Sequence, residues 1–192
     1  IEHGQEKADE CVRFDAKGAP LPVFRLFGVT EDQHSVTCHV HGFLPYFYVT
    51  CPHSVNPQTL STFHARLEHR LRDGDSSPLP LFKTEIVHRT NLYGFVAKSV
   101  DERYIRITCT SPNAMNAAKR IVESGFAYSD QVDTSTQFST FESNIPFVMR
   151  FMVDTHMTGC NWIELPPAKW SLRTRADAVS TSQIECDIYF QD

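Results

Sequence analysis

Apolar and polar positions alternate through the first part of the chain. Val23 to Thr30 (VFRLFGVT) is apolar and β-prone, and Ser35 to His41 (SVTCHVH) alternates with a period of two residues. The polar stretch between these runs is a short turn, so together they predict a β-hairpin, which we expect to form an OB-like portion of the fold. Ile1 to Pro22 is polar and interrupted by Gly and Pro, which predicts an irregular leader.

A pattern of strands and helices follows the hairpin. Strands are predicted at Tyr46 to Thr50, Leu81 to His88, Tyr104 to Thr110 and Phe126 to Ser129. Asn56 before Pro57 predicts an N-cap and a first-turn proline, and the helix that follows carries Leu60, Phe63, Leu67 and Leu71 on one face. Ser111 and Pro112 begin a second helix that runs to about Ser124 and stops at Gly125.

These elements define a fold class and a domain organisation. The order strand, helix, strand, strand, helix, strand over residues 46–129 is the βαββαβ arrangement of ferredoxin-like folds and RNA-recognition modules. Asn144 and Pro146 predict a short helix through Val153, and Ser182 to Phe190 alternates like a strand. We therefore predict an α+β fold with mostly antiparallel mixed sheets and a few short helices. Its expected parts are a leader over 1–22 and one domain over 23–192, with helix and strands over 141–192.

Composition and charge limit the possible functions. The chain has 192 residues with 41% hydrophobic residues, enough for one compact domain or two small lobes. Its formal net charge of -5 is unlike that of an independent duplex binder, which carries excess Lys and Arg. The 6 scattered Cys favour a reducing compartment, nucleus or cytosol. No apolar run is long enough to cross a bilayer, so we expect no membrane partner.

Candidate chemistry is sparse. Zinc-type residues gather at Cys38, His39, His41, Cys51 and His53, but strand alternation points Cys38 away from the two histidines, so we favour a structural role and no metal site. Neither a nucleophile elbow nor a phosphate-binding glycine loop is present, so we expect no catalytic residue. Glu185 is expected to be solvent-exposed between buried Ile184 and Cys186.

Several blocks resemble one known family. They are Phe24 to Val49 (FRLFGVTEDQHSVTCHVHGFLPYFYV), Tyr104 to Gly125, Phe141 to Asp154 and Arg150 to Trp170 (RFMVDTHMTGCNWIELPPAKW). In order and motif they resemble the amino-terminal region of the delta-type replicative DNA polymerases, members of the B family. The resemblance covers nearly all of Pro22 to Asp192. Ile184 to Cys186 is similar to part of the family's Asp-Ile-Glu-Cys exonuclease motif, but Gln183 stands where the first metal-binding carboxylate would be.

The resemblance implies a non-catalytic amino-terminal domain that supports the exonuclease domain and lies near the single-stranded template in DNA replication. The implied parent is a nuclear DNA-directed DNA polymerase with 3'-5' exonuclease activity. It would use Mg2+ and carry carboxy-terminal zinc or iron-sulfur sites, with no cofactor in this region. The implied partners are its own exonuclease and polymerase domains, template DNA, accessory polymerase subunits and the sliding clamp.

Archaeal relatives of that family carry a pocket that inspects template bases. The resemblance transfers its positions to Pro45, Tyr46, Tyr104, Ile145, Pro146, Phe147 and Arg150 as nucleic-acid contacts. The alternative is that Ile145 and Phe147 are core residues, Pro146 starts a helix and Arg150 forms an ion pair within the domain. Leu92 to Ala97 (LYGFVA) partly matches an RNA-recognition strand, with a packed turn as its alternative. A self-standing module for single-stranded DNA or RNA therefore remains a second hypothesis for the whole chain.

Overall fold

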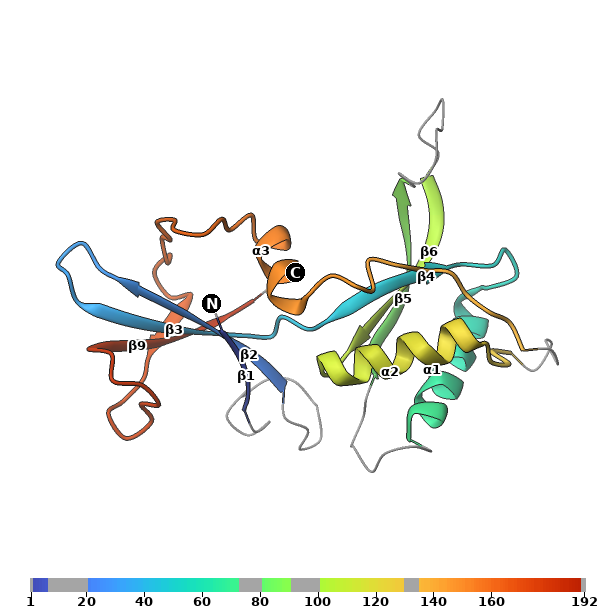
Figure 1. Cartoon of the computed structure of the whole chain (residues 1–192), viewed down its shortest axis with the longest axis horizontal. Coiled ribbons are helices and arrows are strands. Elements are labelled where there is room, and N and C mark those ends of the chain that lie inside the picture. The colour runs from blue at the N-terminus through green and yellow to red at the C-terminus, as the bar shows by residue number, and fades with distance from the viewer. Residues whose placement is uncertain (1, 7–20, 73–80, 91–100, 130–134, 191–192) are drawn as a thin grey trace. The chain divides into compact units, whose positions relative to one another are not determined.

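The elements follow one another along the chain as Figure 1 draws them. The computed structural model describes residues 2–6, 21–72, 81–90, 101–129 and 135–190. In chain order, the strands and helices are β1 Glu2–Glu6, β2 Leu21–Val29, β3 Ser35–His41, β4 Tyr46–Thr50, α1 Pro57–Arg72, β5 Leu81–Thr90, β6 Asp101–Cys109, α2 Pro112–Ser124, β7 Thr140–Phe141, α3 Phe147–Asp154, β8 Trp170–Leu172 and β9 Ile184–Tyr189. They form two compact units, Pro45–Ile145 and Ile1–Leu44 with Pro146–Asp192.

The unit Pro45–Ile145 has the predicted order of strands and helices. Its four-stranded sheet has the order β5-β6-β4-β7, and every neighbouring pair is antiparallel. Helix α1 joins β4 to β5 across β6, and α2 joins β6 to β7 across β4, which is the split βαβ arrangement. Such an order establishes no binding activity by itself.

Both helices of this unit begin at the predicted caps. The side chain of Asn56 accepts a hydrogen bond from the Thr59 backbone N–H at 2.9 Å, with Pro57 at the first helical position. The Ser111 hydroxyl accepts from the Ala114 N–H at 3.1 Å. Both helices bury their apolar side chains against the sheet face that carries the core residues Phe47, Val49, Ile105 and Ile107.

The prediction of a final strand at Phe126 to Ser129 is wrong. Phe126 forms only a single bridge, to Thr136, and the fourth strand of the sheet is β7. Phe126 and Tyr128 are 4% and 3% exposed because their rings join an aromatic cluster with Phe63 and Phe138. The aromatic residues of this extended segment therefore pack in the core, and the segment is not a strand of the sheet.

The other unit contains the predicted hairpin. Its five-stranded sheet has the order β1-β2-β3-β9-β8, in which β3 and β9 are parallel and the remaining neighbours antiparallel. Strands β2 and β3 are the predicted hairpin, although its OB-like interpretation stays a prediction. The helix predicted through Val153 is α3, whose Phe147 and Phe151 rings lie 4.7 and 4.3 Å from the ring of Phe24.

Three details of this unit differ from the expectation. Glu2–Glu6 pairs with Leu21–Arg25, so this part of the leader is a strand and β2 begins before Val23. Strand β8 was not anticipated. The sequence predicts neither β1 nor β8, because β1 (EHGQE) has no alternation of apolar and polar residues and β8 has only three residues.

The proposed RNA-recognition segment Leu92 to Ala97 lies outside the described residues. Over the described ranges, none of the helices combines the length and the apolar character needed to span a lipid bilayer.

Candidate nucleic-acid contacts and a buried polar network

The predicted template-contact residues belong to both units. Pro45, Tyr46, Tyr104 and Ile145 lie in one unit, and Pro146, Phe147 and Arg150 lie in the other. A single nucleic-acid surface formed by all seven stays a prediction.

In the first group, Tyr46 and Tyr104 come from the neighbouring strands β4 and β6. Both rings lie on the sheet face opposite the core residues Phe47 and Ile105. The guanidinium of Arg106 lies 4.0 Å from the centre of the Tyr46 ring, a cation–π contact. Both tyrosines are buried, at 7% and 5% exposed, so their rings act first as packing groups.

The hydroxyl of Tyr104 is held as a donor. It donates a hydrogen bond to Glu102 Oε2 at 2.8 Å, and its ring packs edge-on against Phe141. Desolvation, with the hydrogen bond to Glu102 and its charge, raises the pKa of Tyr104 to about 12. The phenol is therefore neutral at physiological pH.

In the second group, Pro146 is the exposed member. Its carbonyl accepts from the Arg150 N–H at 2.9 Å, so Pro146 caps the start of α3. Phe147 packs against Phe24, and Arg150 is 6% exposed with its guanidinium 3.7 Å from Asp154. These positions agree with the packing alternative for these three residues, while their contact with template stays a prediction.

The zinc-type residues do not gather into one ligand set. His39 Nε2 lies 3.1 Å from Glu185, and His41 Nε2 lies 2.7 Å from Asp187. Cys38 instead faces the thiol of Cys186, and Cys51 belongs to the other unit. Within the part of the chain that the structure describes, no three or more His, Cys, Asp or Glu side chains could hold a metal ion.

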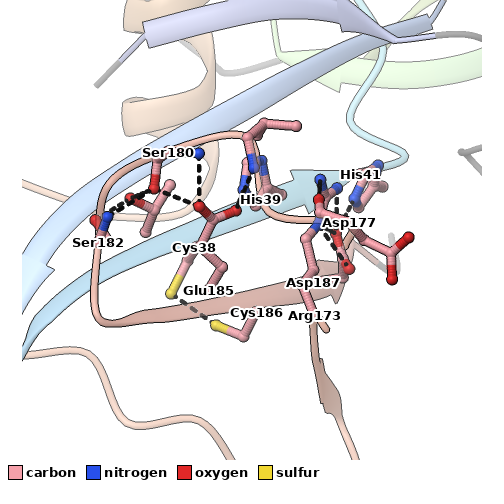
Figure 2. A network of polar contacts seen from close by, with 12 residues as sticks. Cys38, His39, His41, Arg173, Asp177, Ser180, Ser182, Glu185, Cys186 and Asp187 are labelled. Carbon is pink, nitrogen blue, oxygen red and sulfur yellow. Dashed lines mark hydrogen bonds and ion pairs between the residues drawn. The ribbon is translucent and has the colours of Figure 1, made fainter. Parts of the chain in front are cut away.

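Glu185 is the centre of a buried polar network on β3 and β9, drawn in Figure 2. Its carboxylate accepts hydrogen bonds from the backbone N–H groups of Val179 and Ser180, from the Ser180 hydroxyl and from His39. Desolvation raises the pKa of Glu185, but the hydrogen bonds from Ser180, Val179 and His39 outweigh it and lower the pKa to about 2. Glu185 is therefore ionised in the folded protein.

Asp187 forms a second centre one pleat further along β9. Arg173 donates to it through Nε at 2.9 Å and through Nη2 at 2.7 Å, and His41 contacts the same carboxylate. Desolvation opposes ionisation, but the contacts with His41 and Arg173 lower the pKa of Asp187 to about 2. Together the two carboxylates tie the segment 173–180 to the sheet.

The expectation that Glu185 is solvent-exposed is wrong, since it is 5% exposed. The parallel pairing of β3 with β9 brings His39 beside it, and the turn at Val179 and Ser180 covers it. Ile184, expected to be buried, is only half-buried, whereas Cys186 is buried as expected. The alternation of β9 predicts the strand correctly, but the turn at Val179 and Ser180 covers Glu185 on its polar side.

These carboxylates do not fit a magnesium site. A two-metal phosphodiester site needs carboxylates that converge on ions about 4 Å apart. Here Glu185 and Asp187 are each occupied by a histidine and by further donors. Gln183, where the family motif would have its first carboxylate, accepts from the Ser35 N–H at 3.0 Å. The network therefore has a structural role.

Comparisons with known proteins identify relatives for most of the chain. Residues 42–116 match the family model described as DNA polymerase delta catalytic subunit-like, N-terminal domain, and residues 138–192 match that for the DNA polymerase family B exonuclease domain. The DNA polymerase delta catalytic subunit of Oryza sativa is 36% identical over 176 residues, covering 90% of this chain. That of Drosophila melanogaster is 36% identical over 183 residues, covering 91%.

The chain spans only about 16% of the length of these relatives. Among solved structures, the family B DNA polymerase of the archaeon Pyrobaculum calidifontis aligns with a TM-score of 0.58, covering 98% of this chain and 20% of that chain. The sequence identity of that alignment is 15%, so it supports the fold alone.

Proposed function

Because this chain belongs to the family B DNA polymerases and matches the amino-terminal region of delta-type catalytic subunits, we propose that it is a non-catalytic domain of a replicative DNA-directed DNA polymerase. In this proposal, residues 23–192 support the exonuclease domain and lie near the single-stranded template. The observation that carries the proposal is the 36% identity that extends over 90% of the chain. The parent protein would act in the nucleus.

The chemistry of the parent would lie outside this region. Mg2+, when bound by the parent, would supply charge stabilisation for phosphoryl transfer, and zinc or iron-sulfur sites would belong to its carboxy-terminal part. The residues of this chain hold the fold instead, because Glu185 and Asp187 are engaged by His39, His41 and Arg173. Its partners would be the exonuclease and polymerase domains of the same protein, template DNA, accessory subunits and the sliding clamp.

Activity assays test the absence of catalysis. With Mg2+ and a primed template, the purified chain is expected neither to incorporate nucleotides nor to degrade the primer from its 3' end. The protein translated from the complete transcript is expected to do both. Incorporation or degradation by the purified chain itself, surviving further purification, would contradict a non-catalytic role.

We propose further that the template contacts are made by two local groups, one around Tyr46 and one at the start of α3. The support is chemical: aromatic and proline faces can stack on bases, and Arg can orient a phosphate. Pro146 is exposed, whereas Tyr46 and Arg150 are buried. In this proposal Pro146 offers the accessible face of the group at α3, and Arg150, which is buried in the same unit, sets the shape behind it.

Binding to a fluorescent single-stranded DNA at low and moderate salt tests these contacts. Binding is expected to weaken about fivefold or more in Pro146→Ala, which loses an exposed stacking face, and in Tyr46→Ala, which loses the buried ring that shapes its group. Val153→Ala is the matched control, because Val153 is 58% exposed near the other end of α3. Thermal melts separate lost contacts from unfolding of the Tyr46 variant. Equal affinity of all variants, or no binding at low salt, would contradict the contact proposal and leave the structural role.

The self-standing nucleic-acid module is not favoured. Its support was the βαββαβ order, which many proteins with unrelated functions share. Both family models that match describe parts of polymerases.

A further inference from the structure

Two cysteines face each other on the sheet of the unit that contains β3 and β9. Cys38 and Cys186 are register partners on these parallel strands, and their Sγ atoms lie 3.1 Å apart (Figure 2). They occupy the strand positions between those of the polar network, so their side chains project from the opposite face of the sheet. The pair takes no part in the network or in the proposed template contacts.

The geometry suits a covalent bond between them. Neighbouring strands lie about 4.8 Å apart, within the Cα separations of about 4.4–6.8 Å found in disulfides. The Sγ atoms need to approach by about 1 Å to reach bonding distance. Small side-chain rotations are therefore sufficient, and the paired strands can stay in register.

The two thiols differ in reactivity. Cys38 is half-buried, and the hydrogen bond from Cys186 lowers the pKa of its thiol. Cys186 is 2% exposed, and the same hydrogen bond raises the pKa of its thiol. Because the thiolate is the reactive form, Cys38 is suited to meet an oxidant first and Cys186 to resolve the product.

The remaining described cysteines offer a contrast. Cys109 is fully buried, and desolvation raises the pKa of its thiol. Desolvation likewise raises the pKa of Cys51. Cys160 is exposed, and among the described thiols only Cys38 and Cys186 contact each other. The paired arrangement is thus specific to one site.

We propose that Cys38 and Cys186 form a reversible disulfide when the protein meets hydrogen peroxide. The Cys38 thiolate attacks the peroxide O–O bond, giving a sulfenic acid and releasing hydroxide, which takes up a proton to become water. The Cys186 sulfur then attacks the Cys38 sulfur, loses its proton, and releases the sulfenic oxygen as a second water. The two thiols are oxidised by two electrons in total, and a dithiol reductant reverses the reaction.

The disulfide would join β9 covalently to β3, although these strands are far apart in sequence. Closing so long a loop restricts the unfolded chain and stabilises the fold. In a reducing compartment such a bond is expected to be transient and to report on the redox state. The oxidised chain is expected to melt about 5–10 °C above the reduced chain.

Peptide mapping of the wild-type chain tests the proposal without any variant. After mild peroxide treatment, we expect the intact mass to fall by two hydrogen atoms and a non-reducing digest to contain one peptide pair joined through Cys38 and Cys186. Dithiothreitol should restore the mass. An unchanged mass, a linkage between other cysteines, or oxygen added at Cys160 alone would overturn the proposal.

Cysteine variants distinguish the role of Cys38, which reacts with the peroxide, from that of Cys186, which resolves the sulfenic acid. Cys186→Ser should leave a sulfenic acid on Cys38 that dimedone traps, whereas Cys38→Ser should form neither product at this site. Cys160→Ser is the matched control and should form the disulfide at the wild-type rate. Dimedone trapping at Cys160 but not at Cys38 in the Cys186 variant would contradict Cys38 as the reactive thiol.

Discussion

The buried carboxylate of Glu185 allows a quantitative test through Glu185→Gln. The substitution keeps the size of the side chain and one acceptor oxygen, but removes the charge. It also places an amide N–H₂ among hydrogen-bond donors, which include the backbone N–H groups of Val179 and Ser180. The variant is therefore expected to be less stable at neutral pH, where Glu185 is ionised.

The magnitude follows from the pKa of Glu185, which is lowered from 4.5 to about 2 in the folded protein. At about 1.36 kcal/mol for each pH unit, that difference corresponds to about 3 kcal/mol of folding free energy. Because the pKa is lowered on folding, the contribution is complete above pH 4.5 and is lost as the pH falls toward 2. At the acid end, wild type and variant should converge.

Urea unfolding at several pH values between 7 and 2 measures this difference. Glu164→Gln is the matched control, because Glu164 is exposed, and its unfolding free energy should follow that of wild type at every pH. A difference between wild type and Glu185→Gln below about 1 kcal/mol at pH 7, or one that stays constant to the acid end, would refute the reasoning.

Four further predictions concern other features. Asp187→Asn should reduce the free energy of unfolding by about 2 kcal/mol at pH 7 in urea titrations. The loss should vanish as the pH falls from 3.8 to about 2, because the pKa of Asp187 is lowered over that window. An unchanged urea midpoint at pH 7 would contradict the role of the Arg173 and His41 contacts. Gly125→Ala should lower the free energy of unfolding by about 1–3 kcal/mol in the same assay, because Gly125 has φ 92° and an added Cβ would lie 2.7 Å from the Ser135 hydroxyl oxygen. Gly28→Ala serves as the control, because no atom lies within 4 Å of its added Cβ. Ser111→Ala should cost about 1 kcal/mol by removing the cap of α2, and Ser111→Asp should retain most of it, so equal losses in the two would argue against capping. A hydrophobic dye should bind the purified chain, because Trp162, Leu172 and Val179 are 78%, 62% and 58% exposed. Trp162→Gln should reduce the fluorescence of the bound dye. The absence of a dye signal with the wild-type chain would contradict an accessible apolar surface.

The helices and the hairpin could be predicted because their signals are local. Asn56 and Ser111 act within three residues of themselves, and Gly125 takes the positive φ that ends a helix with little strain. The same is true of the β2–β3 turn, where the Thr30 N–H donates to the His34 carbonyl at 2.9 Å. Short-range hydrogen bonds of this kind join residues that are close together in sequence, so the local sequence predicts them.

The buried network could not be predicted, since it depends on pairing between distant segments. His39 and Glu185 are 146 residues apart in sequence, and only the parallel register of β3 and β9 makes them neighbours. A polar residue on an alternating strand is predicted to face solvent when the segment that covers it is unknown. A matching pattern of two histidines on one strand and two acids at the same spacing on another is the one signal that could have suggested the pairing.

The same limit applies to the proposed template contacts. The family resemblance selected seven residues, but it carried no information on burial, and Phe147 and Arg150 lie in packed positions beside Phe24 and Asp154. Among these seven, Pro146 is the one exposed position.

Sequencing the transcript beyond the codon for Asp192 tests the central claim most directly. The account predicts an open reading frame that continues into an Asp-Ile-Glu exonuclease motif and then into the polymerase carboxylate motifs. A stop codon, or a linker into an unrelated domain, would contradict the assignment as a domain of a replicative polymerase.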